Sequence, residues 1–312
     1  MAHVQGGLGF FSDSMRLLEA YMICKKNEQK LYVKSDVWLF KHTLGWNDWF
    51  TTLPDKTEET LPSVQCGSEV DRHFTVLEYK EAMKELFVFQ PYLHELAAKV
   101  AGDLELGDSY VSIFIRRGDK LLGESIYTPT QAYVDMALSK SPSVIFVQTD
   151  DYRVVQEIRE LVKGRDASVR VVSTCPQEKN GFFLNPVENS EIRCLNYVME
   201  DGSNVVNREN LNYIKSTPRQ KPFIEYTPSE IKEHVEEMLI GLILCQKSQY
   251  VVLDNMSNTG RYLFFSRKDG VLFIEYMNII IGSGTPLLPR VNYPDDKYIS
   301  NPRYHCIHNA YT

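Results

Sequence analysis

Two arginines, a glycine, an aspartate and a lysine stand together at positions 116 to 120, directly after a short apolar stretch. That stretch, residues 110–115, has the length and composition of a buried β-strand. Open α/β folds bind their ligands at the carboxyl ends of such strands. Arg116 and Arg117 offer fixed forks of donors to phosphate oxygens, and Lys120 adds a compact positive charge. We therefore predict a diphosphate site here, with the carboxylate of Glu124 beside it for acid–base chemistry. A solvated charged turn is the alternative.

A second polar group ends the next predicted strand, residues 144–148. There Thr149, Asp150 and Asp151 follow one another. Their side chains could orient the arginines or cap the helix that follows, and both interpretations stay open. A metal site at Asp150 and Asp151 is disfavoured, because adjacent residues of a strand point in opposite directions and no third carboxylate is evident.

A third polar group stands where the predicted strand at residues 250–253 turns into a helix. Hydroxyls, an amide and free N–H groups at a helix start suit a diphosphate, and ordinary N-capping is the alternative. The residues concerned are Ser257, Asn258, Thr259, Gly260 and Arg261.

Glycines form a loop near the N-terminus, at Gly6, Gly7 and Gly9. A predicted strand at residues 2–5 precedes the loop and a predicted helix at residues 11–25 follows it. Such a loop lets the backbone approach a ligand closely, and the helix start offers donors to an anion. The last glycine of the dinucleotide-binding fingerprint is missing, so a plain tight turn is the alternative.

The whole chain alternates strands and helices, which predicts an α/β protein. Further strands are expected at residues 31–33, 169–173 and 271–276. Further helices are expected at residues 79–89, 91–100, 129–139, 152–162 and 228–247, with another after the polar group at residues 257–261. Thr128 is the expected N-cap of the third of these, and Thr227 and Glu230 form a capping box for the fifth. Residues 175–222 are polar and loop-rich, as in a lid or an insertion.

The bulk composition excludes some classes of protein. The chain has 312 residues, 43% of them hydrophobic, and a net charge of −7, which argues against nonspecific binding to nucleic acid or to an anionic membrane. Its 6 cysteines show no zinc spacing, which favours buried free thiols. No segment is apolar for long enough to span a bilayer. We therefore expect a cytoplasmic protein or a domain of a longer chain.

The three polar groups and the glycine loop together resemble one family, the α1,6-fucosyltransferases with the bacterial nodulation fucosyltransferases and the protein O-fucosyltransferases. Members carry a glycine-rich turn, then His-x-Arg-Arg-x-Asp-Lys, then Ala-Thr-Asp-Asp, then Ser-Ser-Gln-x-x-Arg at a helix start. This sequence has counterparts in the same order, and they begin at Gly6, Phe114, Gln148 and Ser257. Residues 36–100 and 175–222 match nothing in that pattern.

The resemblance implies a GT-B-like α/β fold, in which two Rossmann-like domains face a cleft. It also implies inverting, metal-independent transfer of L-fucose from GDP-fucose, without a cofactor, to a glycan or glycoprotein acceptor. On this basis residues 1–105 form the acceptor-side domain, residues 106–290 form the nucleotide-sugar domain, and residues 291–312 form a tail on the surface. The glycine- and acid-rich residues 102–108 mark the boundary.

The resemblance also implies roles for individual residues. Arg116, Lys120 and Glu124 are the expected catalytic residues, with Arg116 on the β-phosphate, Lys120 at the leaving diphosphate and Glu124 as general base. Ser257 and Asn258 are expected at the phosphates, with Arg261 supporting their turn. The remaining expected donor-binding residues are Gly7, Gly9, Phe114, Arg117, Asp119, Asp150 and Thr259.

One departure from the family pattern concerns the nucleotide base. The family's histidine, associated with the base, is Phe114 here, and Glu236 or Glu237 could supply a carboxylate for guanine. Another donor, such as a UDP- or GDP-linked pentose or deoxyhexose, is therefore an alternative, as for a xylosyltransferase. A non-catalytic module that binds nucleotides or glycans is the alternative from a different class. The aromatic residues Trp38, Trp46, Trp49 and Tyr127 could stack on acceptor sugars or pack in the core.

Overall fold

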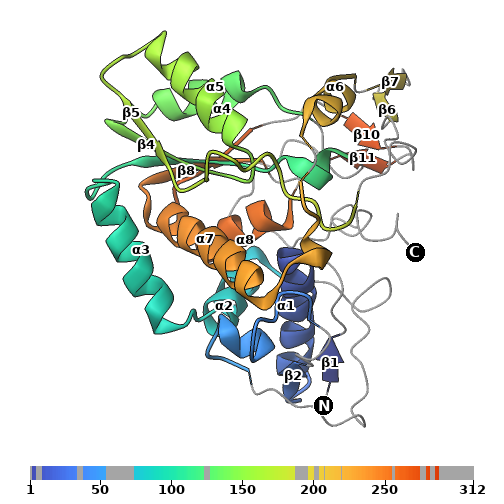
Figure 1. The fold of residues 1–312 in the computed structure, drawn as a ribbon. Helices are drawn as coiled ribbons and strands as arrows, with labels where there is room; N and C mark the ends of the chain where they lie inside the picture. The colour runs from blue at the N-terminus through green and yellow to red at the C-terminus, as the bar shows by residue number, and fades with distance from the viewer. Residues whose placement is uncertain are drawn as a thin grey trace.

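The centre of the protein is a parallel β-sheet of five strands in the order β5-β4-β3-β8-β9 (Figure 1). The strands are β3 (Val111–Ile115), β4 (Val144–Thr149), β5 (Arg170–Ser173), β8 (Tyr250–Leu253) and β9 (Val271–Phe273). The structure is a computed structural model that describes residues 2–4, 9–33, 38–53, 74–122, 127–186, 196–199, 204–206, 208–218, 220–254, 257–274, 279–281 and 285–287. The chain runs outward from β3 to β5 and then returns to β8 on the other side. The topological switch point, where open α/β sheets bind ligands, therefore lies between β3 and β8.

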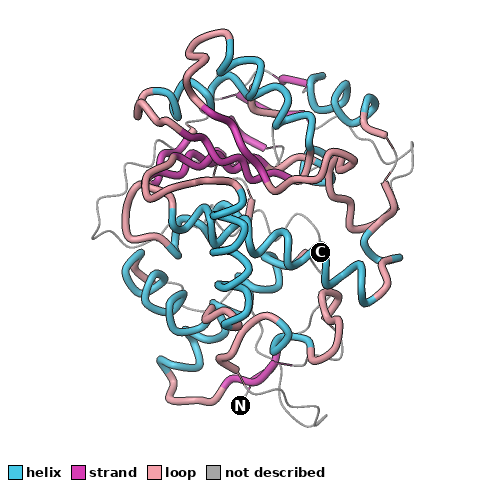
Figure 2. Tube along the Cα trace, turned by 60° about the vertical axis from the view of Figure 1, so that its left-hand side comes forward, coloured by secondary structure: helices cyan, strands magenta, loops and turns pink. Residues whose placement is uncertain are grey.

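Helices cover both faces of this sheet, as Figure 2 shows. One face carries α4 (Thr130–Leu138) and α5 (Tyr152–Lys163), and the other carries α7 (Pro228–Lys247) and α8 (Asn258–Ser266). Side chains alternate across the sheet, since successive strand residues point to opposite faces. Val111, Ile113 and Ile115 pack in the core under α4 and α5, whereas Phe114 belongs to the core that contains α7. The predicted α/β class is confirmed.

The N-terminal part contains both strands and the helix of the predicted strand–loop–helix–strand unit, while residues 5–8 of its loop lie outside the described residues. In it β1 (Ala2–Val4) pairs in parallel with β2 (Leu31–Val33), and α1 (Phe10–Lys26) connects them. The helices α2 (Val76–Leu86) and α3 (Pro91–Asp103) follow. Buried side chains of all three helices share one hydrophobic cluster with α7 and α8. The tryptophans at 38, 46 and 49 are 7%, 1% and 0% exposed in that cluster, so core packing is their role.

The polar region at residues 175–222 contains more regular structure than its composition predicted. It holds β6 (Asn196–Met199), β7 (Asn204–Val206) and α6 (Arg208–Ser216). The two strands join β10 (Ile279–Ile281) and β11 (Thr285–Leu287) in a second sheet of four strands, in the order β11-β10-β6-β7. The short 3-10 turns are η2 (Gly45–Asp48), η3 (Gly118–Leu122) and η4 (Phe223–Glu225). The predicted tail, residues 291–312, lies outside the described residues.

Three predicted helix N-termini can be compared with the structure, and one of them agrees. The capping box of Thr227 and Glu230 is present at the start of α7, as predicted. The helix predicted from residue 79 begins earlier, because Thr75 and Glu78 form a capping box that the prediction overlooked. The prediction for Thr128 was wrong: Pro129 is the N-cap of α4, and the Thr128 carbonyl instead accepts a hydrogen bond from Arg117 at 2.8 Å.

Two predictions about compartment can be compared with the described part of the chain. Cys24, Cys175 and Cys245 are buried free thiols there, as predicted, while the other cysteines lie outside it. Among the helices in those same residue ranges, none has both the length and the apolar composition needed to cross a membrane.

Candidate functional site

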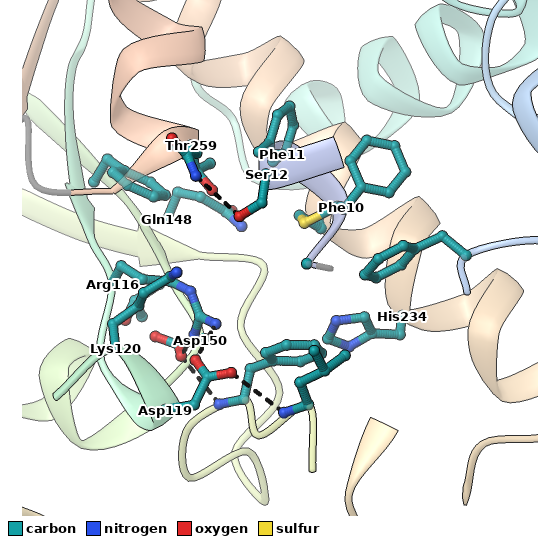
Figure 3. A pocket seen from close by; sticks show the side chains of 18 of the residues that line it. Phe10, Phe11, Ser12, Arg116, Asp119, Lys120, Gln148, Asp150, His234 and Thr259 are labelled. Carbon is teal, nitrogen blue, oxygen red and sulfur yellow. Dashed lines mark hydrogen bonds and ion pairs between the residues drawn. The ribbon is translucent and has the colours of Figure 1, made fainter. Parts of the chain in front are cut away.

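A pocket of about 410 Å³ opens at the carboxyl ends of β3 and β4, against the starts of α1 and α8 (Figure 3). Most of the predicted site residues meet in it. The predicted site residues that line the pocket are Gly9, Phe114, Arg116, Asp119, Lys120, Asp150, Asn258 and Thr259. Gly7 and Glu124 lie outside the described residues. Arg117, Ser257 and Arg261 are described, but they are not among the residues that line the pocket.

Arg116 is held in the pocket wall by two carboxylates. Its guanidinium forms an ion pair with Asp150 and another with Asp119, the latter at 2.8 Å. The same group lies over the ring of Phe182, 4.9 Å from the ring centre. The Arg116 side chain is 13% exposed, so its donors are fixed in direction and still face the pocket. A fixed guanidinium at a strand end is the arrangement expected for a phosphate oxygen.

Asp150 connects the loops around Arg116. Its Oδ1 accepts a hydrogen bond from the backbone N–H of Arg117 at 2.7 Å, and its Oδ2 accepts one from that of Phe182 at 3.0 Å. The backbone N–H of Asp119 donates to the Phe182 carbonyl at 2.9 Å. Asp119 Oδ2 also accepts a hydrogen bond from the Leu184 N–H at 3.2 Å. The loop after β3 and the loop after β5 are therefore joined through two carboxylates and a backbone contact.

Arg117 lies on the other side of the sheet from Arg116. It is 1% exposed, and its guanidinium lies over the ring of Tyr127 at 4.2 Å, near the start of α4. Strand alternation explains this separation, because Arg116 continues the face of Phe114 and Arg117 continues the face of Ile115. Tyr127 is thus a packing partner of this arginine.

The sequence left two roles open for Thr149, Asp150 and Asp151, which were orienting the arginines and capping the next helix. Both roles are present, each at a different residue. Asp150 orients Arg116, as described above. Asp151 is the N-cap of α5 and accepts a hydrogen bond from the Arg153 N–H at 3.0 Å. It also accepts a hydrogen bond from the Tyr213 hydroxyl of α6. Asp151 therefore belongs to the support behind the pocket.

At the start of α8, N-capping and pocket lining are divided between neighbours. Ser257 is 3% exposed and its Oγ accepts a hydrogen bond from the Gly260 N–H at 3.0 Å, which is the capping alternative. Asn258 lines the pocket, and its side chain donates to Ser12 Oγ of α1 at 2.9 Å. Arg261 donates to Asn258 Oδ1 at 3.2 Å. The α8 start is thereby tied to the N-terminal helix.

Other pocket residues were missed by the sequence analysis. They come from the start of α1, the loop after β5 and one face of α7: Phe10, Ser12, Arg16, Lys179, Phe182, His234 and Met238. His234 and Met238 stand four residues apart on the α7 helix, a spacing that places them on one face. This spacing was the only signal in the sequence for the missed residues. The others reach the pocket through contacts between segments far apart in the chain.

His234 lies in an environment that disfavours its charged form. Its ring stacks on Phe182 with 5.0 Å between the ring centres. Burial, together with the positive charges of Lys179 and Arg116, holds the pKa of His234 well below its usual value of 6.5. The imidazole is therefore neutral at pH 7.

This shift predicts a pH dependence of stability. Between the lowered pKa and pH 6.5 the unfolded chain binds a proton at His234 that the folded chain does not. We expect the histidine's contribution to the free energy of unfolding to be complete above pH 6.5 and to fall as the pH drops further. His234→Phe keeps the stacked ring without titrating, so its melting temperature should fall less between pH 7 and pH 5 than that of the wild type. Parallel curves for the two proteins would contradict this prediction.

The two candidate carboxylates on α7 have different partners. Glu237 pairs with Lys179 at 2.6 Å, and burial raises the pKa of Glu237. Glu236 lies 3.8 Å from Lys232 on the same helix. Neither is among the residues that line the pocket, although Lys179 is. In the described ranges there is no group of three or more His, Cys, Asp or Glu residues that could hold a metal ion.

Comparison with known proteins gives distant matches in structure alone. No protein-family model and no curated protein matches the sequence. Solved fucosyltransferases are similar in structure. NodZ α-1,6-fucosyltransferase co-crystallised with GDP has 12% identity and a TM-score of 0.47, over 90% of this chain and 97% of that chain. NodZ from Bradyrhizobium has 12% identity and a TM-score of 0.46, over 90% of this chain and 98% of that one. POFUT1 in complex with GDP has 12% identity and a TM-score of 0.35, over 64% of this chain and 50% of that one.

The structural matches carry the same family name as the motifs. Because the identity is 12% and the TM-scores lie below 0.5, donor, acceptor and mechanism have to be argued from the site itself.

Proposed function

We propose that this protein is a glycosyltransferase whose pocket binds a nucleoside diphosphate sugar, with GDP-fucose as the preferred donor and a glycan hydroxyl as the acceptor. One observation carries the proposal. Arg116, fixed by Asp119 and Asp150, shares a pocket with Lys120 and the start of α8 at the topological switch point. A cation with fixed donors, a second cation and a helix N-terminus are groups that bind a diphosphate.

The proposed reaction is an inverting transfer that needs no metal. A carboxylate takes the proton of the acceptor hydroxyl while the diphosphate leaves from the opposite face of the sugar. In the absence of a metal ion, positive side chains and backbone N–H groups have to stabilise the negative charge on the leaving group. Arg116 and Lys120 supply that charge in the proposal, and Glu124 is the proposed base. In the proposal Arg117, Ser257 and Arg261 do not contact the substrate. They support the loop after β3 and the start of α8.

The proposed architecture is GT-B-like, with the pocket between two Rossmann-like parts. The support for it is that Gly9 and four residues of α1 line the pocket together with the strand ends of the large sheet; the four are Phe10, Phe11, Ser12 and Arg16. The division at residues 105 and 106, with the acceptor on the N-terminal side, remains a prediction of the sequence. Another nucleotide-sugar donor is the second candidate within the same chemistry, because Phe114 replaces the family's histidine. A module that binds without turnover is the remaining candidate.

Replacing Glu124 distinguishes an enzyme from a binding module. We expect Glu124→Gln to lower the rate of transfer by about 100-fold or more, because the base is lost, while the Kd for GDP stays unchanged. The measurement is the release of GDP from GDP-fucose with a panel of glycans, with and without a chelator. Glu178 is an exposed carboxylate in the loop after β5 and does not line the pocket, so Glu178→Gln makes the same change of charge and serves as the control.

Three results would count against the proposal. Equal rates for Glu124→Gln and the wild type would remove Glu124 as the base. Loss of activity in the chelator would contradict the metal-independent mechanism. Tight GDP binding with no turnover on any acceptor or water would favour the binding module.

A further inference from the structure

The helix α6 belongs to residues 175–222, which match nothing in the family pattern, and it packs against the turn η3 (Figure 1). That turn includes Lys120, which lines the pocket. One side chain of α6, that of Asn210, is 4% exposed. A buried side-chain amide needs an acceptor for its nitrogen and a donor for its oxygen, so its partners fix its orientation.

Asn210 joins two backbone groups of the loop after β3. Its Oδ1 accepts a hydrogen bond from the Tyr127 N–H at 2.6 Å, and its Nδ2 donates to the Leu121 carbonyl at 3.0 Å. The two groups flank residues 122–126, which include Glu124. One side chain therefore holds the loop on both sides of the proposed base.

The helix that carries Asn210 is itself held in place. Leu121 is 2% exposed and packs in a small core cluster with Ile214 of α6. The Tyr213 hydroxyl, also on α6, donates a hydrogen bond to the fully buried Asp151 at the start of α5. The helix is thus connected both to the loop after β3 and to the end of β4, so it can serve as a fixed support.

We propose that Asn210 is a positioning residue, which sets the places of Lys120 and Glu124 relative to Arg116 by holding Leu121 and Tyr127. Asn210 is not among the residues that line the pocket, so it acts through the loop. The inference rests on the proposed function, in which Lys120 is a cation at the diphosphate and Glu124 is the base. Arg116 has its own supports in two carboxylates, so loss of Asn210 should lower the rate of transfer and leave GDP binding nearly unchanged.

The first test compares Asn210→Ala with Asn210→Asp at two pH values. An ionised carboxylate still accepts from the Tyr127 N–H, but it sets a negative oxygen against the Leu121 carbonyl. A protonated carboxyl group offers one donor and one acceptor, as the amide does, and burial favours that form. At pH 8 we expect kcat per folded molecule to fall about 30-fold in both variants, with the Kd for GDP within about threefold of the wild type. At pH 5.5 Asn210→Asp should recover to within about threefold of the wild type at that pH, and Asn210→Ala should not.

The second test needs no substrate. Amide hydrogen exchange at Tyr127 reports on the bond from its N–H to Asn210, and it should become about tenfold or more faster in Asn210→Ala. Asn212 is exposed on the same helix, so Asn212→Ala is the matched control and should change neither the exchange nor kcat.

The outcomes separate the role of Asn210 from the proposed function. A normal kcat per folded molecule in Asn210→Ala, even with a lower melting temperature, would mean that the amide only stabilises the fold, and it would overturn the positioning role. An Asn210→Asp variant that stays as slow as Asn210→Ala at pH 5.5 would also overturn it. No transfer by the wild type would overturn the proposed function instead, and the exchange at Tyr127 would then decide alone whether Asn210 holds this loop.

Discussion

Arg116→Ala should slow sugar transfer strongly and weaken GDP binding by roughly tenfold to a hundredfold. The binding loss corresponds to about 1.5–3 kcal/mol for a charge-assisted hydrogen bond. The loss in rate should be larger, about 100-fold to 1000-fold, because the same donors stabilise charge that develops on the leaving diphosphate. Calorimetry with GDP and a turnover assay with GDP-fucose measure the two effects separately.

The size of this effect has a second physical cause. Arg116 is the cation between Asp119 and Asp150, so its removal leaves two carboxylates facing each other in the pocket wall. Those charges would repel the phosphates that the arginine attracts. Arg116→Lys keeps the charge but loses the planar fork, and it should recover binding in part and turnover little.

The control for Arg116 is an exposed arginine that also pairs with an aspartate. Arg165 pairs with Asp135 and its side chain is 38% exposed. Arg165→Ala should leave both GDP binding and turnover unchanged, since exposed pairs contribute little. Normal turnover in Arg116→Ala would remove the loop after β3 from the active site.

The sequence predicted the features of the fold that depend on local residue patterns. Apolar runs located the strands of the large sheet. Because the carboxyl ends of parallel strands share one edge, residues from three loops were expected at one site, and they line one pocket. Strand alternation alone separates the two arginines, with Arg116 toward the pocket and Arg117 toward α4. The same rule separates Asp150 from Asp151. These roles were within reach of the sequence once the register of β3 and β4 was assumed.

The rest of the site depends on contacts between segments far apart in the chain. Asn258 meets Ser12 across 246 positions, and nothing local in either segment indicates the other. Lys179 and Phe182 lie in a loop whose polar composition predicted only irregular structure. That loop has its shape because Asp150 accepts from the Phe182 N–H and Gly118 approaches the Phe182 backbone. Such contacts follow from packing of the whole fold, which pattern and propensity do not encode.

Gly118→Ala should be strongly destabilising, because it combines backbone strain with a steric clash. Gly118 has a φ of +60°, and an added Cβ would lie 2.3 Å from the Phe182 carbonyl oxygen and 2.6 Å from its nitrogen. The left-handed conformation costs about 1–2 kcal/mol for a residue with a Cβ, and forcing backbone apart adds about 1–3 kcal/mol. We expect the free energy of unfolding to fall by roughly 2–5 kcal/mol, with GDP binding lost as the loops separate.

Substitutions at two other glycines distinguish the contribution of backbone strain from that of the steric clash. Gly107 has a similar φ of +65° with no atom within 4 Å of an added Cβ, so Gly107→Ala should show the strain alone, about 1–2 kcal/mol. Gly102 in α3 also has open space and lacks the positive φ, so Gly102→Ala should be neutral or slightly stabilising. Denaturant unfolding of the three variants measures the series. If Gly118→Ala costs no more than Gly107→Ala and keeps GDP binding, the close contact between the Gly118 and Phe182 backbones does not hold the Arg116 loop in place.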